Sequence, residues 1–216
     1  TGRIVMPGLI NAHTHVPMTL FRGVADDLDL KGFLYGRIFP LEARFVDDEF
    51  VRWGTRLACL ELLRGGVTTF VDMYYFVDAI AEEAARAGMR AIVGEGLIDF
   101  PAPDFKTWDE GMAVTERLLK RWHGHRLITA APAPHATYTV SGEHLRAAHA
   151  LAARYDAPML MHLAEARAEV DTIRERYQQG PVEYAASLGI LDDRVVAAHV
   201  VWATPPEIAI LAKSGV

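Results

Sequence analysis

Short apolar stretches alternate along the chain with longer amphipathic stretches. The apolar stretches are rich in β-branched residues and nearly continuous in hydrophobicity, which is typical of parallel strands that are covered on both faces. They predict six strands, over residues 8–13, 67–73, 90–97, 127–133, 158–163 and 195–199. Strands that alternate with helices in this way indicate repeated β/α units around one parallel sheet.

The amphipathic stretches begin with residues that cap helices. Thr107 and Glu110 form a T-x-x-E capping box, and Thr204 and Glu207 form a second one with Pro205 at the first turn. Such boxes satisfy backbone N–H groups that the first turn of a helix leaves unpaired. We therefore expect a helix to begin at each of these positions.

Six successive β/α units, with no sign of a reversal in strand order, favour a (β/α)8 TIM-type barrel over a doubly wound sheet. The Gly-rich phosphate-binding motif of a dinucleotide-binding fold is also missing after the first predicted strand. We expect an α/β fold in which residues 1–216 form a single domain with about six of the eight barrel units. Because the chain starts at Thr1 without a methionine and stops after the sixth unit, the sequence predicts a barrel that is truncated at both ends.

Composition and charge indicate which partners and which cellular location to expect for the protein. The sequence has 28 acidic residues against 22 Lys and Arg, a net charge of −6 and no basic stripe, so a nucleic acid is not expected as a partner. No run of 18 apolar residues is present, so no membrane span is predicted. Cys59 is the single cysteine, which leaves no internal disulfide and suits a reducing compartment, so we expect a cytoplasmic protein.

Histidines lie at the ends of several predicted strands. His13 and His15 are two residues apart, so both side chains of a strand there would point to one face, and His162 and His199 end two later strands. Because the carboxyl ends of barrel strands meet at one face, these histidines can converge on one ion. Imidazoles in this number suit zinc or another late first-row divalent metal. Further polar residues are predicted at the same face: Asp72, Glu95 and His135.

The motifs that carry these residues resemble those of a known superfamily. PGLINAHTH, GGVTTFVDMY, APHATYTV, MHLAE and AAHV occur in the order and spacing of the amidohydrolase superfamily, in the branch of aminohydrolases that includes 5-methylthioadenosine/S-adenosylhomocysteine deaminases and triazine chlorohydrolases. HTHVPMTLFRGVADDLDL followed by FPLEARF is especially similar to the methylthioadenosine/S-adenosylhomocysteine deaminase subgroup. The resemblance covers essentially the whole chain.

The resemblance implies a role for each site residue. It implies three metal ligands, all histidines at strand ends: His13, His15 and His162. It implies that Glu165 transfers a proton and contacts the substrate, and that His199 orients the metal-bound water. Glu42 would contact the ribose of the substrate, and His135 would be a further substrate contact.

The resemblance also implies one divalent cofactor, zinc in the first place and iron(II) as the alternative. Binuclear relatives bridge two ions with a carbamylated lysine at the fourth strand, and the stretch TAAPAPHATYT has no lysine. An aspartate ligand from the eighth strand would lie beyond Val216. Residues 1–216 expressed alone are therefore expected to hold metal weakly, to be inactive, and to be poorly soluble because the first and sixth strands leave unpaired edges.

The implied reaction is hydrolytic deamination of an adenosine-type nucleoside (5-methylthioadenosine, S-adenosylhomocysteine or adenosine) by metal-bound hydroxide, which gives the inosine product and ammonia. A metal with three histidines and a carboxylate keeps one position open for water and lowers the pKa of that water to about 7. Glu165 follows His162 by three residues, so it can pass a proton from this water to a ring nitrogen without binding the ion. The expected partner is a small-molecule purine nucleoside, and the sequence leaves a homo-oligomer open.

Two other functions remain open from the sequence. One is an s-triazine or other amino-heterocycle chlorohydrolase or aminohydrolase that uses the same hydroxide, and the other is a catalytically silent assembly module. Glu42 favours a nucleoside, because an acid that binds ribose has no use with a ring that carries no sugar. The three histidines with Glu165 argue against a silent module, because a buried polar cluster is costly to retain.

Several residues near the predicted site have two interpretations. Asp72 either holds a loop or supports a metal ligand. Arg22 and the acids of its own loop, Asp26 and Asp27, either form salt bridges with one another, which is the expected arrangement, or contact the substrate. An aromatic cluster either lines a purine pocket or packs in the core: Tyr74, Tyr75 and Phe76.

Overall fold

The computed structural model describes residues 2–216 and contains six β-strands, one at each position that the sequence predicts. The strands are β1 (Leu9–Thr14), β2 (Val67–Tyr74), β3 (Arg90–Leu97), β4 (Ile128–Pro134), β5 (Met159–Leu163) and β6 (Val195–His199). Each strand begins and ends within about one residue of its predicted range, so the alternation of apolar and amphipathic stretches located every strand correctly.

The strands pair in parallel and in chain order. β1 to β4 form a four-stranded sheet, and β5 and β6 form a separate pair. The two groups are joined by an isolated bridge between Ala136 and His162 and by a hydrogen bond of 2.9 Å from the His162 N–H to the His135 carbonyl. The chain therefore has the predicted mixed α/β architecture, with six β/α units of a TIM-type barrel.

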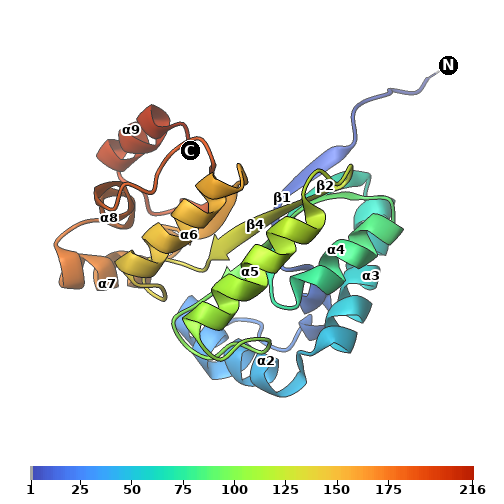
Figure 1. Cartoon of the computed structure of the whole chain (residues 1–216), viewed down its shortest axis with the longest axis horizontal. Helices are drawn as coiled ribbons and strands as arrows, with labels where there is room; N and C mark the ends of the chain where they lie inside the picture. The colour runs from blue at the N-terminus through green and yellow to red at the C-terminus, as the bar shows by residue number, and fades with distance from the viewer. Residues whose placement is uncertain (1) are drawn as a thin grey trace.

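Helices connect successive strands. They are α3 (Asp48–Arg64), α4 (Val77–Arg86), α5 (Trp108–Trp122), α6 (Gly142–Arg154), α7 (Arg167–Tyr177), α8 (Pro181–Ser187) and α9 (Pro205–Ser214). Figure 1 shows α3, α4 and α5 together on one side of the molecule, and α6 to α9 together on the other. Within residues 2–216, no helix is both long and apolar enough to cross a membrane.

The predicted capping residues start their helices. The Thr107 hydroxyl accepts from the Glu110 N–H at 3.3 Å, and Glu110 accepts in return from the Thr107 N–H at 3.2 Å. Glu207 is buried, and it accepts from the Thr204 N–H at 2.9 Å and from the Val182 N–H at 3.2 Å. The second box therefore also ties the start of α9 to α8.

The segment between β1 and α3 forms short helices that no periodicity in the sequence predicted. They are η1 (Val16–Phe21), α1 (Leu30–Phe33), the π-helical turn η2 (Leu34–Ile38) and α2 (Phe39–Phe45). η1 packs on α3 at Gly54, where an added Cβ would lie 2.4 Å from the Pro17 carbonyl oxygen. This close approach fixes the direction of the chain after residues His13, Thr14 and His15 at the end of β1.

Small and branched side chains fill the inside of the partial barrel. The buried residues of this inner cluster come from three strands: Val71, Met73, Ala131, Ala133 and Leu160. Gly94 on β3 faces them, and a Cβ there would lie 2.6 Å from Cβ of Ala133 and 2.9 Å from Cδ1 of Leu160. The interior is thus a packed core, and the chemistry is left to the strand ends.

Candidate active site

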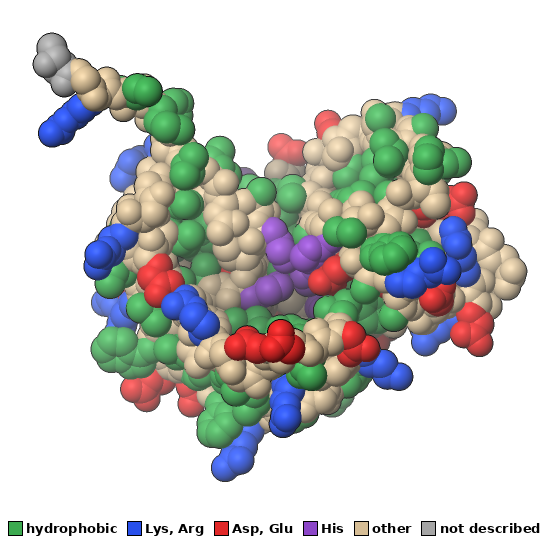
Figure 2. All heavy atoms as spheres, turned by 180° about the vertical axis from the view of Figure 1, so that it is seen from behind, with side chains coloured by type: hydrophobic (Ala, Val, Ile, Leu, Met, Phe, Trp, Pro, Cys, Tyr) green, Lys and Arg blue, Asp and Glu red, His purple; other side chains and the backbone are tan. Residues whose placement is uncertain are grey.

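Four histidines from three strands meet at the carboxyl ends of the strands. The His13 ring centroid lies 4.9 Å from that of His15, 5.0 Å from that of His162 and 4.9 Å from that of His199. One ring nitrogen each of His13, His162 and His199 lies within 4.8 Å of the other two. Figure 2 shows histidine side chains gathered in a hollow in the middle of one face of the molecule. The convergence predicted from the strand ends is confirmed.

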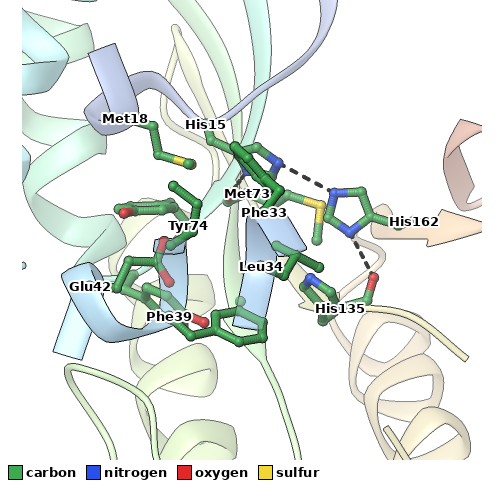
Figure 3. Close-up of a pocket in the computed structure, with 13 residues that line it drawn as sticks. His15, Met18, Phe33, Leu34, Phe39, Glu42, Met73, Tyr74, His135 and His162 are labelled. Carbon is green, nitrogen blue, oxygen red and sulfur yellow. Dashed lines mark hydrogen bonds between the residues drawn. The ribbon is translucent and has the colours of Figure 1, made fainter. Parts of the chain in front are cut away.

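Two of these histidines point unprotonated nitrogens at each other. Nδ1 of His15 lies 2.6 Å from the Met73 carbonyl oxygen, and Nδ1 of His162 lies 2.9 Å from the His135 carbonyl oxygen. A carbonyl only accepts, so each Nδ1 carries the proton and each Nε2 is left with a lone pair. The two Nε2 atoms are 3.4 Å apart (Figure 3). Facing lone pairs repel unless a cation lies between them, so this donor set fits a metal ion.

The rings of the cluster are kept neutral by their surroundings. Burial, assisted by the neighbouring His15, lowers the pKa of His13 to about 4. Burial likewise lowers the pKa of His135 to about 3, and it lowers the pKa values of His15 and His162. Only neutral imidazole binds a metal, so the cluster is prepared to do so near neutral pH.

Glu165 and His199 face each other at the ends of β5 and β6. Nε2 of His199 lies 3.5 Å from Oε1 of Glu165, and burial raises the pKa of Glu165. Both strand ends turn sharply, since Ala164, His199 and Val200 have left-handed backbones with φ of 49°, 73° and 54°. Such φ values are uncommon for residues with a side chain, and they cluster at functional sites. These turns bring the side chains of Glu165 and His199 toward each other.

A pocket beside the histidines contains two of the three predicted substrate contacts, Glu42 and His135, whereas Glu165 does not line it. His15, His135, His162 and Glu42 line it together with apolar residues of the short helices after β1: Met18, Phe33, Leu34, Ile38 and Phe39. In Figure 3 the Glu42 side chain points from α2 toward Tyr74, across the pocket from His162. Burial raises the pKa of Glu42 to about 7, while the Tyr74 hydroxyl opposes the shift. The apolar wall was not predicted, although FLYGRIFPLEARF is rich in apolar residues.

Asp72 holds the chain on both sides of His15. Its Oδ1 accepts from the Thr14 hydroxyl at 2.9 Å and from the Val16 N–H at 2.5 Å. Of its two interpretations, the structure therefore supports the one in which it holds a loop. Arg22 forms the expected kind of surface ion pair, but its partner is Glu61 on α3 at 2.7 Å rather than an acid of its own loop.

The aromatic cluster after β2 divides between pocket and core. Tyr74 and Tyr75 are buried, belong to the main core cluster and also line the pocket, so both interpretations of these two residues hold. Phe76 lies at the start of α4, where its N–H donates to Asp104 at 2.6 Å. It does not line this pocket.

Glu95 is a buried acid on β3 that stands apart from the histidine cluster. Among residues 2–216 neither of its carboxyl oxygens has a hydrogen-bond partner, and burial together with the neighbouring Asp104 raises its pKa well above the ordinary value. The folded protein therefore keeps a proton on Glu95 that the unfolded chain loses above about pH 4.5. The contribution of Glu95 to the free energy of unfolding then falls as the pH rises above that value.

Glu95→Gln is expected to gain stability relative to the parent as the pH rises, because glutamine resembles the neutral acid and needs no proton. The gain should approach about 1.4 kcal/mol per pH unit above the unfolded-state pKa of 4.5, for as long as the folded protein keeps the proton on Glu95. Urea unfolding of both full-length proteins at several pH values measures it, with the exposed Glu175→Gln as control. A difference in stability that does not change with pH would show that Glu95 is ionised in the fold.

The chain is similar over nearly its whole length to proteins that are named as deaminases. The 5-methylthioadenosine/S-adenosylhomocysteine deaminase of Syntrophobacter fumaroxidans is 46% identical over 215 residues, which cover 100% of this chain and 49% of the relative. The 5'-deoxyadenosine deaminase of Methanopyrus kandleri is 44% identical, over 99% of this chain and 49% of the relative. The chain thus spans about half the length of these relatives.

The chain is also similar to a solved structure, and it matches the model of one protein family. A crystal structure of an adenosine deaminase from Xanthomonas campestris with bound zinc superposes with a TM-score of 0.94 at 42% identity, covering 97% of this chain and 48% of that one. The histidine cluster and this likeness together support a bound divalent metal ion. The model of the amidohydrolase family matches residues 4–216. The chain therefore belongs to the amidohydrolase family, as its motifs indicated.

Proposed function

We propose that the whole protein is a hydrolytic deaminase of adenosine-type nucleosides such as 5-methylthioadenosine, S-adenosylhomocysteine, 5'-deoxyadenosine or adenosine. One observation carries the proposal: the Nε2 atoms of His15 and His162 face each other. Both histidines line a pocket that is also lined by the buried Glu42. The names of the similar proteins support an adenosine-type substrate. The proposed partner is thus a small-molecule nucleoside, bound in one barrel domain.

The proposed metal is zinc, which suits several imidazole ligands and is bound in the similar crystal structure. His13, His15 and His162 are the proposed ligands, with His199 beside them. When bound, the ion supplies a Lewis acid that makes water nucleophilic near neutral pH. The imidazoles are oriented for this by the Met73 and His135 carbonyls, which fix the tautomers of His15 and His162.

Glu165 is the proposed proton carrier. Burial raises the pKa of its carboxyl, so it can take a proton from water and give it to a ring nitrogen of the substrate. That protonation makes the amino-bearing ring carbon more electrophilic, so that the deprotonated water adds to this carbon. The carbon–nitrogen bond then breaks, and the amino group leaves as ammonia with the proton of the added hydroxyl group. His199, 3.5 Å away, holds the Glu165 carboxylate and the attacking water in line. His135, whose Nδ1 is 2.8 Å from the Thr139 hydroxyl, presents its other nitrogen to the substrate.

A substrate panel tests the proposed function. The full-length protein is incubated with 5-methylthioadenosine, S-adenosylhomocysteine, 5'-deoxyadenosine, adenosine, adenine and a chlorinated s-triazine, and release of ammonia and of chloride is measured. We expect ammonia from the nucleosides and little reaction with adenine or the triazine. Preferred turnover of the triazine would favour the amino-heterocycle hydrolase, and no turnover of any compound would favour the silent module.

Glu42→Ala is expected to reduce the preference for nucleosides over free bases. A buried carboxylate that accepts from ribose hydroxyls contributes about 1 to 3 kcal/mol, so kcat/KM for adenosine should fall about 5- to 150-fold. The kcat/KM for adenine should change little. Glu49→Ala, an exposed acid in the first turn of α3, is the matched control. Equal losses with both substrates would place Glu42 outside the ribose site.

A further inference from the structure

Glu169 is a buried acid behind the strand end that carries Glu165. It lies in the first turn of α7 and is 2% exposed. Its Oε1 accepts from the Thr137 hydroxyl at 2.8 Å, and its Oε2 accepts from the Glu165 N–H at 2.8 Å. One carboxylate therefore joins the loop after β4 to the turn after β5.

The turn that Glu169 holds has a strained backbone. Ala164 has a left-handed φ of 49°, which costs an alanine on the order of 1 to 3 kcal/mol unless its surroundings impose it. The Glu165 N–H follows this residue directly and points back to Glu169. The Trp202 N–H also donates to the Ala164 carbonyl at 2.8 Å. The turn is thus held from the α7 side by a carboxylate and from the β6 side by a backbone N–H.

The contacts of Glu169 differ from those of an ordinary helix cap. The N-cap of α7 is Ala166, and a glutamate three residues into a helix ordinarily accepts from the N–H of the N-cap residue itself. Glu169 accepts instead from the residue before the N-cap, Glu165. Its second oxygen is committed to Thr137, two residues after His135. The carboxylate is therefore directed at the two loops that present the proposed proton carrier and a proposed substrate contact.

We propose that Glu169 is a positioning residue that fixes the Glu165 carboxylate against His199 and the substrate. The inference rests on the proposed function for its catalytic part. Glu169 itself does not line the pocket with the histidines, so it acts through the turn at Ala164 and Glu165. Loss of its hydrogen bonds lets that turn relax, and a displacement of about 1 Å at a catalytic group can cost about 100-fold in rate.

Three variants of the full-length enzyme separate positioning from folding. Glu169→Ala removes both hydrogen bonds, and kcat for the best nucleoside is expected to fall about 10- to 100-fold with KM and metal content nearly unchanged. Glu169→Gln should restore most of kcat, because its amide oxygen can accept from the Glu165 N–H and its NH2 group can donate to Thr137. Thr137→Val, which removes one hydrogen bond with little change of shape, should give an intermediate loss. Glu175→Ala, an exposed acid of the same helix, is the control.

A double variant shows whether the effect passes through Glu165. If Glu169 only positions Glu165, then adding Glu169→Ala to Glu165→Gln should cause no further loss of kcat. Fully additive losses, a loss of bound metal, or a change confined to KM would overturn the inference. An active parent enzyme with an unaffected Glu169→Ala variant would reject this inference alone and leave the proposed function standing.

A structural readout keeps the inference testable even if the proposed function fails. In a crystal structure of Glu169→Ala, we expect Ala164 to leave its left-handed conformation or the Glu165 carboxylate to move away from His199. An unchanged turn, with φ of Ala164 near the 49° of the parent and the Glu165 carboxylate still beside His199, would overturn the inference whatever the substrate is. A parent enzyme that is inactive on every nucleoside of the panel would instead reject the proposed function.

Discussion

Glu165→Gln is expected to lower kcat for the best nucleoside by about 100- to 10,000-fold, the loss that is typical when a general acid-base group is removed. Glutamine keeps the size of the side chain and one of its acceptors, but it cannot carry a proton between water and a ring nitrogen. The contact with His199 at 3.5 Å is retained in part, so the site should stay in shape. Metal content should therefore remain near that of the parent.

Ammonia release measures kcat of the Glu165→Gln variant, and elemental analysis of the same purified sample measures its metal content. Glu175→Gln changes an exposed acid ten residues along the chain and should match the parent in each. His199→Ala should also lower kcat without emptying the metal site. Parent-like turnover by Glu165→Gln would refute the proton transfer proposed for this residue.

His162→Ala is expected to remove the tightly held metal ion and with it the activity. The imidazole is 4% exposed, and its Nε2 faces that of His15, so the substitution deletes a donor from the centre of the cluster. Loss of an outer partner of a metal ligand commonly costs about 10- to 100-fold in affinity, and loss of a ligand itself should cost more. His13→Ala should act in the same direction.

Elemental analysis after dialysis against a chelator tests this expectation on the full-length protein. The parent should retain about one divalent ion per chain, and both variants should retain far less. His144→Ala is a suitable control, because His144 lies away from the site with its Nδ1 2.7 Å from Asp99. Two ions in the parent that both resist dialysis, or normal metal content in His13→Ala, would contradict a single site built on these histidines.

The fold and the convergence of the histidines could be predicted because both follow from local sequence patterns. A nearly continuous apolar stretch gives a buried strand, and the strands of a parallel barrel end at one face. The finer arrangement depends on geometry that no pattern contains. The register of β1 against β2 shifts between Asn11 and Thr14, and β1 ends at Thr14, so His15 lies just beyond the strand that carries His13. The three histidines whose ring nitrogens all lie within 4.8 Å of one another are His13, His162 and His199, while His15 approaches His162.

The residues that were missed depend on tertiary contacts. The helices between residues 16 and 45 have no clear periodicity, and they are held by contacts such as that of Gly54 with Pro17. The apolar wall of the pocket could not be located for the same reason. Glu169 has the sequence pattern of an ordinary first-turn acid, and only its contacts with Thr137 and the Glu165 N–H distinguish it. The assignment of individual ligands, proton carrier and substrate contacts remains a prediction.

The division of the strands between a four-stranded sheet and a separate pair has a consequence for the dynamics of the site. His13 lies on the first sheet and His15 directly follows its first strand, whereas His162 and His199 lie on the second sheet. The two sheets are joined by the bridge at Ala136, by the hydrogen bond of the His162 N–H and by the packing of Leu160 in the inner cluster. An ion held by both groups would add a cross-link between two sheets that few backbone hydrogen bonds join. Metal binding would then slow the local opening motions of β5 and β6 far more than those of helices buried within either unit. The active site would be most rigid when it is ready to react.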